Sequence, residues 1–243
     1  SKVLSGLNVD YIGAGNQNVN TLNYGSLTIS TNGVRTVTFP AAVVGVSNVF
    51  SPTSVTTTYV IMGNTINFNG TVAQTIPAFT YHNLISGGSS AKTLSGNIVV
   101  NNDLTITSNI DVSASNFSIT IKRNWINNGT FNAQNGAVIF NGSVAQTLSG
   151  TGTTTFNQMD MNNTAGGVTL ASGTYILNSV INPLNGNFNT NGQSFTMVSD
   201  ASRTARIGQV ATTASLSGNF IVQRYITARD TSYADLCSPV QGS

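Results

Sequence analysis

Two nine-residue stretches of the chain are almost the same, FNGTVAQTI at Phe68–Ile76 and FNGSVAQTL at Phe140–Leu148. They differ only by Thr to Ser and Ile to Leu, and the second begins about 72 residues after the first. Self-similarity at a fixed period is the sequence signature of a fold made of repeated units, each too small to bury its apolar face alone. The two stretches are therefore either one site used twice or one piece of scaffold built twice.

A degraded third copy lies upstream, and it separates what the repeat keeps from what it loses. The copies keep a glycine followed four residues later by a glutamine, and these repeat marks are Gly13, Gln17, Gly70, Gln74, Gly142 and Gln146. The alignment predicts three super-repeats, at about 9–65, 66–137 and 138–199. We expect the three glutamines to occupy equivalent positions, with their amides bonded to the backbone of a corner or of an adjacent coil.

The spacing of the copies indicates a coil length. The shifts of about 57, 72 and 76 residues are close to multiples of 18 or 19, and short runs that alternate apolar residues with Thr, Ser or Asn recur on that scale. Asn-Gly pairs favour hairpins and hence a β-sandwich, but they also suit corners that need a left-handed φ. The repeat outweighs the hairpin alternative, so we predict an all-β parallel β-solenoid with coils of about 18–19 residues and leave its handedness open.

The composition agrees with stacked coils. Charged residues are 7% of the chain, hydrophobic residues are 40%, glutamate is absent and the formal net charge is +2. Uncharged Asn, Gln, Thr and Ser can stack on themselves in successive coils, whereas stacked like charges repel. So small a net charge, without a basic stripe, gives no reason to expect nucleic-acid binding.

The last part of the chain has a different charge density. Seven of the 16 charged residues follow Ser199, and a long strand is expected at Asn219–Ile226. We therefore predict that the solenoid covers 1–199 and that 200–243 is either a cap on the last coil or the start of a further β domain. No apolar run is long enough to span a membrane, and the sequence reads as a segment of a longer protein.

The repeated sequence resembles that of a known class of proteins. INFNGTVAQTIPAFTYHNLI, followed by TL, NNDLTI and NFSITI, resembles the repeats of large cell-surface and secreted proteins of the Bacteroidota, including adhesin-like proteins exported by the type IX secretion system. The tail GNFIVQRYITARDTSYADLCSPVQG resembles a segment that often follows such repeats. The resemblance covers about Val9–Gly242. It implies an extracellular protein, attached to the cell surface or released, with a C-terminal sorting domain that these residues do not show.

One patch of the sequence is typical of a ligand site. In KRNWINNG, an exposed Trp125 beside Lys122 and Arg123 could stack on a sugar ring, and the alternative is that Trp125 fills the solenoid interior. The carboxylate pairs Asp103 with Asp111 and Asp230 with Asp235 are weak candidates for glycoside hydrolysis. They and the lone His82 are better explained as turn and surface residues. Short Thr runs raise the possibility of ice binding, but their spacing does not place them in register.

The sequence thus predicts a non-enzymatic stalk or scaffold of a secreted bacterial surface adhesin or filament. It predicts no catalytic residue, cofactor, metal site or membrane insertion, and partners among surface glycans, other surface proteins or secretion-system proteins. A carbohydrate-binding solenoid is the main alternative, ahead of a polysaccharide-degrading β-helix enzyme and an ice-binding protein.

Overall fold

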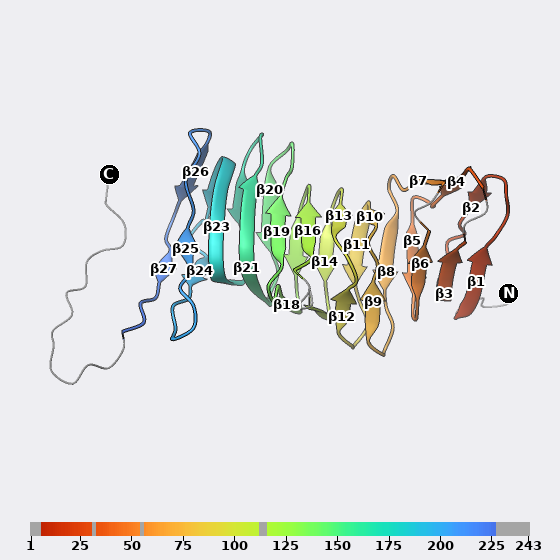
Figure 1. Cartoon of the computed structure of the whole chain (residues 1–243), viewed down its shortest axis with the longest axis horizontal. Helices are drawn as coiled ribbons and strands as arrows, with labels where there is room; N and C mark the ends of the chain where they lie inside the picture. Colours follow the sequence, from red (N-terminus) through yellow and green to blue (C-terminus); the bar gives the residue numbers. More distant parts are fainter. Residues whose placement is uncertain (1–5, 31–32, 54–55, 112–115, 227–243) are drawn as a thin grey trace.

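The chain folds as a parallel β-solenoid of about ten turns in a computed structural model that describes residues 6–30, 33–53, 56–111 and 116–226. The described residues contain strands and no helix. Figure 1 shows the strands stacked along the longest axis, with β1 and β27 at opposite ends. The predicted all-β parallel β-solenoid is confirmed.

Each coil contributes a short strand to each of three faces. The first face runs through most of the molecule as β5 (Val43–Val46), β8 (Thr65–Phe68), β11 (Asn83–Ser86), β14 (Leu104–Ile106), β17 (Trp125–Asn127), β20 (Gln146–Ser149), β22 (Val168–Leu170), the end of β23 (Thr174–Asn189) and β26 (Ala214–Ser217). Every neighbouring pair is parallel, so this face is one uninterrupted ladder.

The second and third faces are built in the same way. The second consists of β9 (Gln74–Ile76), β12 (Lys92–Leu94), β15 (Asn109–Asp111), β18 (Thr130–Asn132), the start of β21 (Thr153–Asn162), the start of β23, β24 (Ser194–Met197) and β27 (Ile221–Val222). The third consists of β10 (Thr80–Tyr81), β13 (Ile98–Val100), β16 (Ser118–Ile121), β19 (Ala137–Phe140), the end of β21, the middle of β23 and β25 (Arg206–Ile207).

The N-terminal coils follow the same path with one difference. β1 (Leu7–Tyr11), β3 (Asn23–Ile29) and β6 (Phe50–Pro52) join the large sheet. β2 (Gln17–Asn18), β4 (Arg35–Thr38) and β7 (Thr57–Val60) form a separate three-stranded sheet. The ring of Tyr59 in β7 lies 4.9 Å from that of Phe79, next to β10, so this small sheet continues the third face.

The coils are longer and less uniform than the sequence indicated. The step from Ile66 to Leu84 on the first face has the expected length. The steps that follow, to Leu104, then to Trp125 and then to Leu148, are each longer than the one before. The predicted coil length therefore holds in part of the chain and is too short for most of it, because turns of variable length separate strands of nearly constant length.

The core is a continuous column of inward side chains. Strands alternate buried and less buried positions, as in β8, β11, β16 and β19. Register stacks Tyr81, Val100, Ile121 and Phe140 on one another along the third face. Period-2 alternation and coil stacking together therefore produce one core that runs the length of the rod.

The stack of parallel coils continues past Ser199, where the density of charged residues rises. β25 pairs with the middle of β23, β26 with its end, and β27 with β24, all in parallel. The boundary expected at 199/200 therefore falls inside the solenoid, and the expected long strand at Asn219–Ile226 is limited to β27. Residues 227–243, which include Cys237, Asp230 and Asp235, lie outside the described residues.

Candidate functional site

Trp125, the residue proposed to stack on a sugar, is completely buried. It lies in β17 in register with Leu104 and Leu148, and its ring is 4.6 Å from that of Phe131. Alternation along the strand turns Trp125 inward and leaves Asn124 and Ile126 as the less buried neighbours. The sugar-stacking interpretation of Trp125 is therefore wrong, and its alternative, a side chain that fills the interior, describes the structure.

Lys122 and Arg123 are exposed, in the turn between β16 and β17. The backbone of Arg123 helps to hold the next coil, because its carbonyl accepts a hydrogen bond of 2.8 Å from Gln146 Nε2. Without Trp125 beside them, the two cations no longer form the patch that the sequence indicated. They remain two exposed charges on one turn.

The second and third repeat marks build the same corner. Gln74 Oε1 accepts a hydrogen bond from the Gly70 backbone N–H at 2.8 Å, and Gln74 Nε2 donates to the carbonyls of Val46 and Asn48 in the preceding coil, each at 2.9 Å. Gln146 does the same with the Gly142 N–H at 2.9 Å. Its Nε2 donates to the carbonyls of Ile121 and Arg123 at 3.0 and 2.8 Å. Both amides are buried and bridge two coils, so this repeat is scaffold.

The first copy is different. Gln17 is only partly buried, and its Oε1 accepts a 3.0 Å hydrogen bond from Arg35 of the following coil. Gln17 pairs with Val37, whereas Gln74 pairs with Lys92. No preceding coil lies within the described residues to offer carbonyls to Gln17.

The three glutamines also lie on three different faces. Gln17 is in β2 of the small sheet on the third face, Gln74 is in β9 on the second face, and Gln146 is in β20 on the first face. The expectation of equivalent coil positions is therefore wrong, because the shifts between the copies are not whole numbers of coils. The local corner is reproduced, while its place on the rod changes.

Close approach of backbone is the reason for the two buried corner glycines. A Cβ at Gly70 would lie 2.2 Å from the Ser47 carbonyl oxygen, and one at Gly142 would lie 2.7 Å from that of Lys122. At Gly13 the nearest atom would be the flexible amide of Gln17, at 2.8 Å. None of the three has a positive φ. The expected left-handed corner is thus wrong at these positions.

Two cations lie inside corners. Lys92 is fully buried and donates from Nζ to the carbonyls of Ser90 at 2.9 Å and Gly70 at 3.3 Å, and burial lowers its pKa. Arg35 is buried and donates to the carbonyls of Tyr11, Gly13 and Ser30 as well as to Gln17. Both side chains satisfy turn carbonyls that would otherwise lack donors.

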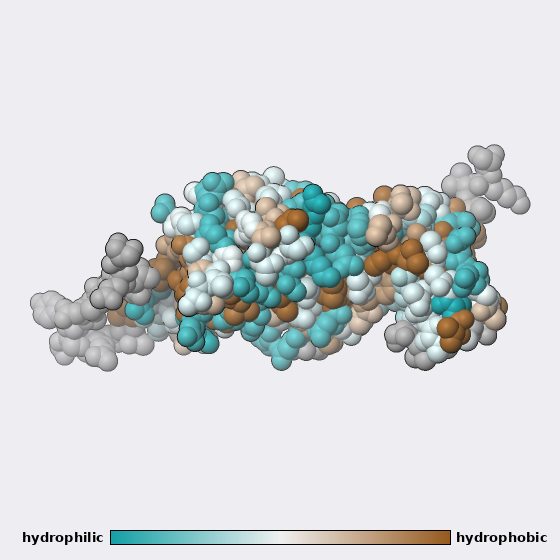
Figure 2. All heavy atoms as spheres, turned by 90° about the horizontal axis from the view of Figure 1, so that it is seen from above, coloured by the Kyte–Doolittle hydropathy of each residue, from teal (hydrophilic) through white to brown (hydrophobic). Residues whose placement is uncertain are grey.

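Outward amides form ladders along the edges. Asn185 Nδ2 donates to Asn162 Oδ1 at 2.6 Å, and Asn162 Nδ2 donates to Asn141 Oδ1 at 3.4 Å. On the first face, Asp103 and Asn124 each accept a hydrogen bond from the backbone of the following coil. Figure 2 shows the face seen from above as largely hydrophilic along its middle, with separate hydrophobic patches. The scarcity of charge and the wealth of asparagine thus have a structural use.

The remaining candidates are dispersed. Asp103 precedes β14 on the first face and Asp111 ends β15 on the second, so this pair is not brought together on one face. His82 is partly buried beside β10. Register stacks Thr130, Thr153 and Thr174 in one outward column, which the short Thr runs did not reveal. The adjacent column is chemically mixed, Asn132, Thr155, Ile176 and Thr196, so a two-column Thr array is not formed.

No family model, curated protein or solved structure matches the chain. The described residues contain no group of three or more His, Cys, Asp or Glu placed to hold a metal ion. A search of the same residues for a helix long and apolar enough to cross a membrane finds none.

Proposed function

We propose that the chain is a stiff, non-enzymatic structural segment of a secreted bacterial surface protein, used as a stalk or scaffold for attachment or display. The observation that carries this proposal is the uninterrupted parallel ladder of the first face, from β5 to β26. Hydrogen bonds of this ladder run along the rod axis, and one core of packed side chains fills it. Such an element sets a distance between what lies at its two ends.

The corners and ladders support the same proposal. The buried amides of Gln74 and Gln146 connect their corners to the preceding coil, and outward asparagines connect some of the coil edges. Few charged side chains and many satisfied backbone groups leave little for a protease to bind in extended form. The resemblance to surface proteins of the Bacteroidota supports the extracellular location and export by the type IX system.

Stiffness is tested by distances between spin labels on Ala14→Cys and Ser215→Cys, in a Cys237→Ser background. We expect one narrow distance distribution. Deleting residues 84–103, which register defines as one coil of the first face, should shorten the distance by about 4.8 Å while keeping it narrow. A broad distribution in the undeleted chain would exclude a stiff segment.

The role on a cell is tested with an epitope displayed at the outer end of the chain. Cells that carry a Gly/Ser linker of equal residue number serve as the control, since such a linker is a flexible coil. Under extracellular protease, the epitope on the solenoid should persist after that on the linker is lost. Equal rates of loss would count against the stalk.

A further inference from the structure

A cleft is built into the edge between the second and third faces in the C-terminal half of the rod. Its walls are two projecting turns, Gln134–Asn135 before β19 and 199–204 before β25. Between them the chain turns the same edge with far shorter corners, at Asn157 within β21 and at Asn178–Ser179 within β23. Long turns on both sides of short ones leave a depression of about 510 Å³.

Unpaired amides line this cleft. Within the described part of the chain, the side chains of Asn135, Asn157 and Asn178 make no hydrogen bond. On another edge of the rod, by contrast, Asn141, Asn162 and Asn185 form a ladder. Each amide offers donors and an acceptor in fixed positions. Successive corners are about 4.8 Å apart, close to the length of one pyranose unit.

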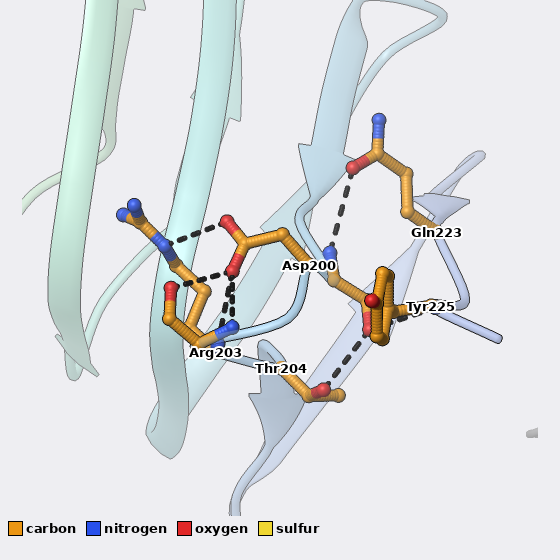
Figure 3. Close-up of polar contacts among 7 residues, drawn as sticks. Asp200, Arg203, Thr204, Gln223 and Tyr225 are labelled. Atoms are coloured by element: carbon orange, nitrogen blue, oxygen red, sulfur yellow. Dashed lines mark hydrogen bonds and ion pairs between the residues drawn. The ribbon is translucent and has the colours of Figure 1, made fainter. Parts of the chain in front are cut away.

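Two arginines complete the cleft. Asp200 accepts hydrogen bonds at Oδ1 from Ser202 Oγ at 2.7 Å, from the Ser202 N–H at 2.8 Å and from the Arg203 N–H at 3.0 Å. Arg203 Nε donates to Asp200 Oδ2 at 3.0 Å. Figure 3 shows the two terminal nitrogens of Arg203 directed away from that carboxylate. Arg206 lines the same cleft from β25 and is exposed.

The Asp200 carboxylate thus positions Arg203 without occupying its terminal nitrogens. The hydrogen bonds from Ser202 and the charge of Arg203 hold the pKa of this carboxyl below its ordinary value. Two other carboxylates of the neighbourhood lie outside the cleft lining: Asp111 accepts from Gln134 Nε2, and Asp160 accepts from Gln158 and Asn182. The charged side chains that line the cleft are therefore Arg203 and Arg206, and Asp200 forms an ion pair with the first of them.

We propose that this cleft binds an acidic polysaccharide, with a uronate carboxylate on the terminal nitrogens of Arg203 and Arg206 and sugar hydroxyls on the amides of Asn157 and Asn178. A guanidinium fork matches a carboxylate with two parallel hydrogen bonds. Amide side chains both donate to and accept from vicinal hydroxyls. An acidic peptide fits less well, because peptide sites bury apolar anchors and this lining is polar.

The test uses the chain of the printed sequence with polygalacturonate, fully methyl-esterified polygalacturonate and poly-aspartate, each measured by calorimetry at low salt. The wild type should bind the free acid at least about tenfold more tightly than the ester, as expected for loss of a charged partner. Equal binding of acid and ester would overturn the proposal. Binding of poly-aspartate as tight as that of polygalacturonate would replace the polysaccharide with an acidic peptide.

Matched variants locate the site. The double change Arg203→Gln with Arg206→Gln should weaken polygalacturonate binding at least about tenfold. Asn178→Ala, which keeps every charge, should weaken it by about threefold or more. Arg123→Gln removes one exposed charge outside the cleft and should change binding less than about twofold. Unchanged thermal unfolding shows that each variant is folded, and equal losses in the Arg123 and cleft variants would refute a built site.

Discussion

The corner at Gly13–Gln17 and the corners at Gly70–Gln74 and Gly142–Gln146 have the same spacing but different surroundings. The two later glutamines are buried and donate to carbonyls of a preceding coil. The first is partly exposed and accepts from Arg35 of the following coil. The motif forms a structural bridge where carbonyls of the preceding coil face the glutamine amide, as they do at Gln74 and Gln146. The same glycine and glutamine spacing is therefore expected to contribute different amounts to stability at different places in the chain.

Alanine at the glycines should give the largest contrast. Gly70→Ala places a Cβ 2.2 Å from the Ser47 carbonyl oxygen, a backbone atom that cannot move alone. We expect the free energy of unfolding to fall by about 3 kcal/mol, the upper range for overpacking. Gly13→Ala places its Cβ nearest to the flexible Gln17 amide, at 2.8 Å, and should cost less than about 1 kcal/mol. Chemical denaturation of both variants measures the difference, and equal losses would contradict it.

Leucine at the glutamines should give a smaller difference in the free energy of unfolding. Gln146→Leu removes two accepted and two donated hydrogen bonds. The Gly142 N–H, the Asn163 Nδ2 group and the carbonyls of Ile121 and Arg123 then lack that partner. The expected loss is about 2 kcal/mol. Gln17→Leu should lose less than about 1 kcal/mol, since its position is open to water. If both variants unfold at the same denaturant concentration, the preceding coil has no energetic role.

Lys92 donates to the carbonyl of Gly70, and its contribution to stability depends on pH. Burial lowers its pKa below the ordinary 10.5, so between the lowered value and 10.5 the unfolded chain binds more protons than the folded chain. The free energy of unfolding should therefore rise with pH across this window. Lys92→Met should abolish the rise, because the replacement side chain does not titrate. At neutral pH it should also lower the free energy of unfolding by about 1 kcal/mol or more, since the Ser90 and Gly70 carbonyls lose their donor.

The measurement is a series of denaturation curves below about pH 10, where tyrosines of the unfolded chain begin to lose protons. Above that, burial of Tyr59, which raises its pKa to about 12, acts in the opposite direction. The native chain therefore becomes less stable as pH rises further. A rise that survives in Lys92→Met would assign the effect to another group.

The smallest effect is expected at the exposed corner. Gln17→Glu keeps an oxygen for Arg35 and adds a negative charge near its guanidinium, which should stabilise the chain by about 0.5 kcal/mol. The gain should be present above the ordinary carboxyl pKa and be lost as pH falls through a lowered folded value. The same change at Gln74 should destabilise, because a buried carboxylate would face two carbonyls. A gain at both positions would erase the distinction.

The fold was predictable because alternation, Asn and Gly turns and an internal repeat all indicated stacked parallel strands. The coil length was not, because the turns vary while the repeat spacing records only a total. Because the coil length was not known, the sequence left open whether Trp125 points inward or outward. Its inward position depends on its register with Leu104 and Leu148. A systematic pairing of inward columns along the sequence would have indicated it.

The cleft was beyond sequence reasoning for a related reason. Its residues come from four separate corners, and only the rod brings Gln134, Asn157, Asn178 and Arg203 to one edge. The one available signal was the concentration of charge after Ser199. That signal was interpreted as a boundary, whereas the structure places β25–β27 in the same stack.

The spacing of the copies has a consequence for how such a rod can lengthen. After Gln74 the chain passes the second face again at Lys92, Ile110 and Phe131. Gln146 then lies on the first face, one face before the chain would reach the second face for the fourth time. A duplication of that length thus adds about 18 Å of rod and shifts the phase of the motif by one side. Growth by duplication need not respect whole turns, and a group carried on the repeated unit would point in a new direction with every copy.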